Sequence, residues 1–129
     1  AIDSVASKCL LIAKAREAGI PIVTAGGAGG RRDPTKLRLA DLAEASHDRL
    51  LQRVRKVLRK DHGFPRRDEP FGVTCVFSPE EAVQPEEESC EPGDPKKCNR
   101  YGTAAFVTGA FGFATAACVV DKLTEDRGK

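Results

Sequence analysis

The residues best suited to chemistry lie at the start of the chain and just after its first predicted strand. Asp3 comes directly before Ser4, which can cap a helix because its hydroxyl can accept a hydrogen bond from a free backbone N–H of the first turn. A carboxylate at such a junction points out of the carboxyl edge of a sheet, where open α/β folds bind ligands. The segment 1–9 and the strand after it therefore predict one half of a nucleotide-handling sheet.

Glycines occupy positions 26, 27, 29 and 30, after the predicted strand 20–25. One interpretation is a phosphate cradle, but a dinucleotide loop requires G-x-G-x-x-G at the opening of a helix. Arg32 stands where the third glycine would fall, and a turn at 33–35 follows. The pattern favours the other interpretation, a strand exit whose backbone can be approached closely.

The cysteines and histidines indicate neither a disulfide framework nor a zinc site. The chain has 5 Cys, an odd number, and no pair has C-x-x-C spacing, so we expect a reducing compartment. Cys90 and Cys98 lack zinc-ligand spacing, and His47 and His62 do not complete a pattern. Cys75, within an apolar run, is predicted to be a core residue.

Hydrophobic periodicity and turn residues predict the elements that position these groups. They are a helix at 4–18, strands at 20–25, 36–42 and 72–78, a helix at 46–60, and a long apolar helix at 103–120. The second strand is expected to run antiparallel to the first because their connection is short. Ser46 is the expected cap of the second helix, with Asp48 in its first turn.

The helix 46–60 has one apolar stripe and one basic face. Net charge is only +2 and does not by itself indicate a nucleic-acid partner, but almost no acid interrupts this face. The face is either a solvated helix surface or an RNA phosphate footprint, and both interpretations stay open. The basic residues of this face and of the segment after it are Arg49, Arg53, Arg55, Lys56, Arg59, Lys60, Arg66 and Arg67.

The segment 103–120 contains no charged residue and is rich in Ala, Gly, Thr and Phe. Its length lies at the short end of a membrane span, which needs about 17–25 residues. A helix that is apolar all round can also be buried in a core or face a second copy of the chain. The small residues favour burial or dimerisation, with membrane contact as the alternative.

Six segments in order carry a resemblance to a known family. They are 1–5 (AIDSV), 21–30 (PIVTAGGAGG), 33–35 (DPT), 41–43 (DLA), 72–78 (GVTCVFS) and 102–112 (GTAAFVTGAFG). Together they resemble the carboxyl-terminal half of the tRNA threonylcarbamoyladenosine dehydratases. These belong to the ubiquitin-activating-like adenylating superfamily, with the adenylyltransferases of small sulfur-carrier proteins.

The resemblance implies an α/β fold, namely the carboxyl-terminal half of a Rossmann-like adenylating domain. A parallel part would enter at 21–25, with an antiparallel extension from 36–42 and 72–78 and a long apolar carboxyl-terminal helix. Residues 1–129 would form that half-domain, with 79–98 as an acidic, Pro-rich crossover loop. The chain has no Met and starts at the strand-to-helix junction, so we expect a fragment whose nucleotide-binding amino-terminal half is missing.

The resemblance also implies an activity: ATP activates the threonyl carboxylate of the modified adenosine beside the tRNA anticodon, and loss of water closes a ring. Asp3 matches the family aspartate that handles Mg²⁺ and the ATP phosphates. Lys8 matches a basic position near the adenylate. Cys98 matches a crossover-loop cysteine that can take the activated carboxyl as a thioester. We expect the fragment alone to be inactive.

The implied partners are tRNA, a second copy of the chain, the amino-terminal half of the same enzyme and, through 103–120, a membrane. The implied location is the cytoplasm of a bacterium or the mitochondrial outer membrane of a eukaryote, without secretion. Two alternatives remain. One is an adenylyltransferase for a sulfur-carrier protein with a Gly-Gly tail. The other is a non-catalytic module that dimerises or attaches to a membrane.

Overall fold

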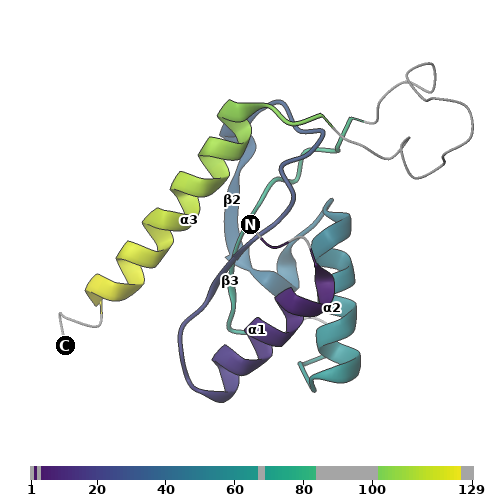
Figure 1. Cartoon of the computed structure of the whole chain (residues 1–129), viewed down its shortest axis with the longest axis vertical. Helices are drawn as coiled ribbons and strands as arrows, with labels where there is room; N and C mark the ends of the chain where they lie inside the picture. Colours follow the sequence, from purple (N-terminus) through teal and green to yellow (C-terminus); the bar gives the residue numbers. More distant parts are fainter. Residues whose placement is uncertain (1, 3, 67–68, 84–101, 126–129) are drawn as a thin grey trace, which may run out of the picture.

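A computed structural model describes residues 2, 4–66, 69–83 and 102–125 and shows a mixed three-stranded sheet with helices on both faces (Figure 1). β1 (Val23–Ala25) and β3 (Thr74–Phe77) are parallel, and β2 (Arg38–Asp41) is antiparallel to β3. The strand order is β1-β3-β2. The predicted mixed α/β architecture is therefore confirmed.

The strand within 36–42 runs antiparallel to β1, as predicted, but it pairs with β3 and not with β1. The strand within 72–78, predicted as part of the antiparallel extension, runs parallel to β1 at the centre of the sheet. The connection from β1 contains the glycine segment and the short 3₁₀ helix η1 (Pro34–Lys36). That connection is long enough to pass over the position of β3, which lies between β1 and β2. The short separation of β1 and β2 in the sequence therefore does not make them neighbours in the sheet.

β3 supplies side chains to both faces of the sheet, because successive strand residues point in opposite directions. Cys75 and Phe77 join the core under the first two helices, whereas Val76 packs on the opposite side. Cys75 is fully buried, so its prediction as a core residue is confirmed.

α1 (Val5–Glu17) and α2 (Arg49–Asp61) pack against each other on one face of the sheet (Figure 1). The Ser4 Oγ accepts the Ser7 N–H at 3.3 Å, which confirms the predicted cap. The buried side of α1 consists of Cys9, Ile12 and Ala13. Leu11, on the same helix, is 50% exposed and lines a groove.

α2 begins later than predicted because Asp48, and not Ser46, is its cap. The Asp48 Oδ1 accepts the Leu51 N–H at 2.9 Å. The predicted apolar stripe is confirmed: Leu51, Val54 and Leu58 are fully buried. The helix ends before Gly63, which has a φ of 66°, a left-handed conformation that favours glycine.

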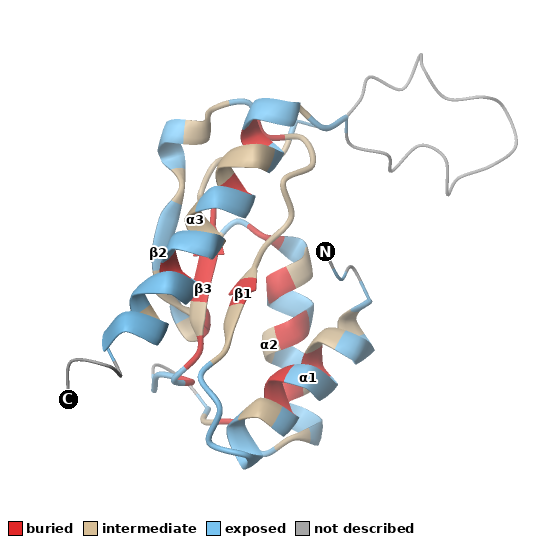
Figure 2. Ribbon diagram, turned by 60° about the vertical axis from the view of Figure 1, so that its left-hand side comes forward, coloured by how far each residue is buried: buried red, intermediate tan, exposed pale blue. Residues whose placement is uncertain are grey.

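α3 (Ala105–Glu125) covers the opposite face of the sheet, alone among the described helices (Figure 1). Its inner side is held by Val107, Phe111 and Cys118, which pack with Val76. Its outer side is exposed along its length (Figure 2), and Phe113 is 81% exposed. Burial within this chain is thus limited to one side, and the helix continues past the predicted end at 120.

α3 is long and apolar enough to cross a membrane by length and composition, and 17% of its most apolar 18-residue window is buried. The outer face is therefore a surface that a second chain or a lipid could cover.

A second short 3₁₀ helix, η2 (Leu42–Glu44), follows β2 and is capped by Asp41. The Asp41 carboxylate also reaches the segment before β3: Oδ1 accepts the Phe71 N–H and Oδ2 accepts the N–H groups of Gly72 and Val73, at 2.8 to 3.1 Å. These bonds fix the register of β2 against β3. Most of the predicted crossover loop, 84–98, lies outside the described residues.

Candidate functional site

A groove of about 1530 Å³ opens at the carboxyl end of β1, between α1, α2 and the amino-terminal part of α3. Lys8, the glycine segment 26–29, Arg31 and residues 45–50 line it, together with apolar residues from α1 and β1. This is the edge of the sheet where the sequence predicted a ligand site.

Lys8 projects from the first turns of α1 toward the end of β1. Its Nζ donates to the Ala25 carbonyl at 2.9 Å and to the Thr24 Oγ1 at 3.2 Å. Thr24 is buried, and Lys8 is half-buried. These bonds hold an ammonium group in the groove, at the carboxyl end of β1.

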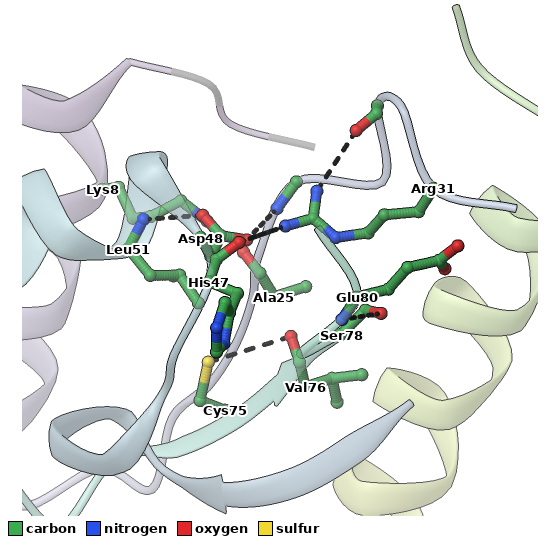
Figure 3. Close-up of polar contacts among 12 residues, drawn as sticks. Lys8, Ala25, Arg31, His47, Asp48, Leu51, Cys75, Val76, Ser78 and Glu80 are labelled. Atoms are coloured by element: carbon green, nitrogen blue, oxygen red, sulfur yellow. Dashed lines mark hydrogen bonds and ion pairs between the residues drawn. The ribbon is translucent and has the colours of Figure 1, made fainter. Parts of the chain in front are cut away.

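Asp48 connects the start of α2 to the glycine segment and to Arg31 (Figure 3). Its Oδ2 accepts the Gly27 N–H at 2.8 Å and lies 3.6 Å from the Arg31 Nη2. The Arg31 guanidinium also donates to the carbonyls of His47, at 2.9 Å, and Gly29, at 3.2 Å. Both charged side chains are at least 94% buried, so the ion pair is shielded from solvent.

Gly26 is the point of closest approach between the glycine segment and α2. A Cβ built on Gly26 would overlap the Asp48 Oδ2 and lie 3.0 Å from the Leu51 Cδ1. At Gly27 the nearest such atom, the Arg31 Nη1, is 3.9 Å away. The segment is thus a close-approach strand exit, as the pattern favoured, and it also lines the groove.

The segment that follows the glycines is tied to the end of β3. The Glu80 carboxylate accepts the backbone N–H groups of Arg32, at 3.2 Å, and Asp33, at 3.1 Å. The Glu80 N–H in turn donates to the Ser78 Oγ at 3.2 Å. These bonds hold one rim of the groove in place.

A second, smaller groove of about 750 Å³ lies along the basic face of α2. Its lining residues are Gln52, Arg53, Arg55, Lys56, Arg59, Lys60 and Arg66. The basic face predicted from the sequence is therefore one continuous surface in the described structure. Arg49, at the start of α2, lines the larger groove instead.

The basic side chains of this surface differ in their surroundings. The Arg59 guanidinium lies over the Phe71 ring, 5.1 Å from its centroid, and Nε donates to the Pro65 carbonyl at 3.2 Å. Arg55 is half-buried, whereas Arg53, Lys56 and Lys60 are exposed. Arg59 thus serves the packing of the chain, and the exposed cations are free to meet a ligand in the groove.

Three residues of the predicted site, Asp3, Cys98 and Arg67, lie outside the described residues, so their roles stay predictions. Within the described part of the chain, no group of three His, Cys, Asp or Glu residues could hold a metal ion. The sequence did not identify Arg31 and the bridging role of Asp48. The one local signal in the sequence is Gly26 itself, because the structure shows that a side chain at this position would overlap Asp48.

Curated proteins of four organisms match this chain, and all are named tRNA threonylcarbamoyladenosine dehydratases. The Haemophilus influenzae protein is 40% identical over 132 residues, covering 98% of this chain and 50% of that protein. The Escherichia coli protein is 38% identical over 133 residues, covering 95% and 50%. The Bacillus subtilis protein is 30% identical over 83 residues. No family model matches.

Solved structures give the same result. The Escherichia coli dehydratase, TcdA, in complex with AMP superposes with a TM-score of 0.84 at 37% identity, over 98% of this chain and 48% of that one. The same enzyme in complex with ATP gives 0.82 at 38% identity, over 99% and 47%. The chain spans about half the length of the relatives that it matches most fully. In sequence and in fold, this chain is similar to about one half of the tRNA threonylcarbamoyladenosine dehydratases of Haemophilus influenzae and Escherichia coli.

Proposed function

We propose that this chain supplies one half of the site of an ATP-dependent tRNA-modifying enzyme. The enzyme would activate the threonyl carboxylate of N6-threonylcarbamoyladenosine beside the anticodon and cyclise it with loss of water. The names of the relatives and the AMP and ATP complexes of the Escherichia coli enzyme support this proposal. The structural observation that carries it is the groove at the carboxyl end of β1, with Lys8 held at the strand end.

The groove fits a polyphosphate in its charge. Four cations line it, Lys8, Arg31, Arg49 and Arg55, of which Arg31 is already paired with Asp48. We propose that the adenylate end of ATP lies near Lys8. Because a phosphate carries concentrated negative charge, cations and free backbone N–H groups are its usual partners.

The described residues fit Mg²⁺ less well than they fit phosphate. The Asp48 carboxylate accepts two backbone N–H groups and faces Arg31, so it is not available as a metal ligand. A carboxylate from this chain for Mg²⁺ would be Asp3, as the family resemblance implies. Bound Mg²⁺ would neutralise charge on the ATP phosphates, and Asp3 would hold it there.

The amino-terminal half of the enzyme is the proposed partner that completes this site. β1 is an edge strand in the described sheet, with its second edge unpaired. Ile2 and Leu11, which are 40% and 50% exposed, line the groove beside Ile22. An added strand at this edge would pair with β1 and cover these side chains. On this proposal the chain by itself does not turn over ATP.

Two further roles stay with the resemblance. Cys98 would take the activated carboxyl as a thioester before ring closure, with AMP as the leaving group. The exposed outer face of α3, from Phe106 to Leu123, would pair with a second copy of the chain or rest on a membrane. Either contact would remove large apolar side chains from water.

The experiment is a measurement of AMP release by a fusion of this chain to the amino-terminal half of the Haemophilus influenzae relative. The proposal predicts that tRNA carrying the uncyclised modification stimulates release and that a sulfur-carrier protein with a Gly-Gly tail does not. An Asp3→Asn fusion is the matched control and should release little AMP with either. Stimulation by the carrier protein alone would instead favour the adenylyltransferase alternative.

A further inference from the structure

Arg55 lies where the two grooves meet. The larger groove at the carboxyl end of β1 and the basic groove along α2 share two lining residues, Gln52 and Arg55. Arg55 is the cation of this pair, and Arg53, Lys56 and Lys60 on the same helix line the basic groove alone. A ligand that extends from one groove into the other must pass the Arg55 side chain.

The Arg55 guanidinium has an unused donor. Its Nη1 is buried and has no hydrogen-bond partner among the described residues. Burial lowers the pKa of this guanidinium, and the charge of Arg59 lowers it further. A buried donor without an acceptor is destabilising, and more so when the group is charged. This cost is removed when an anionic oxygen binds.

Nearby acidic groups do not fill this role. The Asp48 carboxylate is already used by the Leu51 and Gly27 N–H groups and faces Arg31. The lining of the basic groove contains six cations and one amide, and no acid. On the side of the basic groove, the surroundings of Arg55 therefore attract an external anion, and no acid in the described lining competes for the guanidinium.

We propose that Arg55 binds a phosphate group of a ligand that runs from the basic groove into the groove at the carboxyl end of β1. The inference rests on the proposed function and deepens it. An RNA phosphodiester is the source that the geometry favours, because the cations beyond Arg55 continue along α2 as successive backbone phosphates would. The other source of the same chemistry is an ATP phosphate entering from the larger groove. The planar guanidinium suits either, since its donors match two phosphate oxygens at once.

The first test compares RNA binding by the 129-residue chain and three variants. The probe is an anticodon stem-loop RNA, followed by fluorescence anisotropy at several salt concentrations. Arg55→Gln should weaken binding roughly 10-fold to 100-fold, whereas Arg53→Gln, the matched exposed control, should weaken it less than about fivefold. Arg55→Lys should not restore affinity, because an ammonium lacks the two-donor fork. Circular dichroism melts check that each variant is folded.

The second test measures binding on the unmodified sequence and needs a variant only to assign one signal. The arginine side-chain N–H signals are recorded by NMR, with Arg55 assigned by its loss in Arg55→Lys. Addition of the stem-loop RNA should shift the Arg55 signal, which identifies a phosphodiester. If the Arg55 signal shifts with ATP and not with RNA, the ligand is the nucleotide phosphate. Arg55 then still binds a phosphate, but not one of an RNA.

Two results overturn the inference in different ways. In the first, Arg55→Gln and Arg53→Gln lose the same affinity for RNA and the Arg55 signal does not shift. The unmodified chain then still binds RNA, but Arg55 has no special role in that binding. Absence of RNA binding by the unmodified chain, with no Arg55 shift by ATP, would remove the phosphate site as well. The first result spares the proposed tRNA substrate and the second does not, so the two failures are distinguishable.

Discussion

The Asp48 carboxylate accepts the Gly27 backbone N–H at 2.8 Å and thereby joins the start of α2 to the end of β1. The same carboxylate caps α2 through the Leu51 N–H and faces the buried Arg31 guanidinium. One side chain thus sets the position of a helix, a glycine segment and a cation around the groove. Its removal should affect both the stability of the chain and the shape of the site.

Replacement of Asp48 by Ala should lower the free energy of unfolding by about 3–5 kcal/mol, because it leaves the Arg31 charge buried and unpaired. Asp48→Asn should cost less, since an amide oxygen can still cap the helix. Urea unfolding followed by circular dichroism measures both. Glu44→Ala is the control: Glu44 is exposed, and its loss should change stability by no more than about 0.5 kcal/mol. Equal stability of Asp48→Ala and the control would contradict the bridging role.

Gly26 and Gly27 are neighbours with opposite tolerance for a side chain. Gly26→Ala places a methyl group against the Asp48 carboxylate and should destabilise the chain by about 1–3 kcal/mol. Gly27→Ala meets no atom closer than 3.9 Å and should be nearly neutral. Thermal melts of the two variants give the comparison. The close-approach account fails if Gly27→Ala is the more damaging change.

The elements that depend on local sequence were predictable, and those that depend on distant partners were not. The Ser4 cap and the stripe of Leu51, Val54 and Leu58 follow from neighbouring residues and helical periodicity. The choice between Ser46 and Asp48 as the cap did not, because it depends on Gly27 and Arg31. Both residues are suitable caps, and tertiary contacts decided between them.

Strand pairing shows the same limit. The place of β3 between β1 and β2 depends on backbone pairing between residues far apart in the sequence, as in Thr24 with Cys75 and Leu39 with Val76. Within the site, the role of Lys8 near the adenylate stays a prediction from the resemblance. The Arg31–Asp48 pair has no sequence signal of its own. The sequence composition of α3 could not show that only one of its sides is covered within this chain.

The Cys75 thiol should resist deprotonation. Burial raises its pKa to about 12, well above the value of about 8.5 for an exposed thiol. Stability from the neutral thiol is therefore fully present below about pH 8.5 and is lost as the pH rises toward 12. Over that window the free energy of unfolding should fall by up to about 1.4 kcal/mol per pH unit through this group.

Cys75→Ser removes the titrating thiol and is the matched variant for that measurement. Its free energy of unfolding should vary less with pH than that of the unmodified chain, once both are measured by urea titration in alkaline buffers. Alkylation mapping supplies a second reading: Cys75 should react with iodoacetamide only in the unfolded chain. Rapid alkylation of the native chain at Cys75 would contradict the burial.

Phe111 and Phe113 test the one-sided packing of α3. Phe111 is 5% exposed and Phe113 is 81% exposed on the same helix. Phe111→Ala should cost about 3–5 kcal/mol of stability, whereas Phe113→Ala should change it by no more than about 0.5 kcal/mol in the monomer. Denaturant unfolding at low protein concentration makes the comparison, and equal losses would mean that the outer face is covered.

Sedimentation of a Phe113→Glu variant then asks what covers that face. A charge at this position should dissociate a dimer that uses the outer face of α3, because an unpaired carboxylate would be buried between the two helices. Flotation with anionic vesicles tests the lipid alternative with the same variant. No change in either measurement would exclude the outer face of α3 as a contact surface of this chain.

The most direct test of the central claim is the mass of the modified nucleoside after incubation of uncyclised tRNA with ATP and the fusion protein. If this chain is half of a cyclising dehydratase, the fusion should convert N6-threonylcarbamoyladenosine to a product lighter by one water. The 129-residue chain alone should leave the nucleoside unchanged. Conversion by the chain alone would contradict its assignment as half of an ATP site. No conversion by a folded fusion that binds ATP would contradict the proposed reaction.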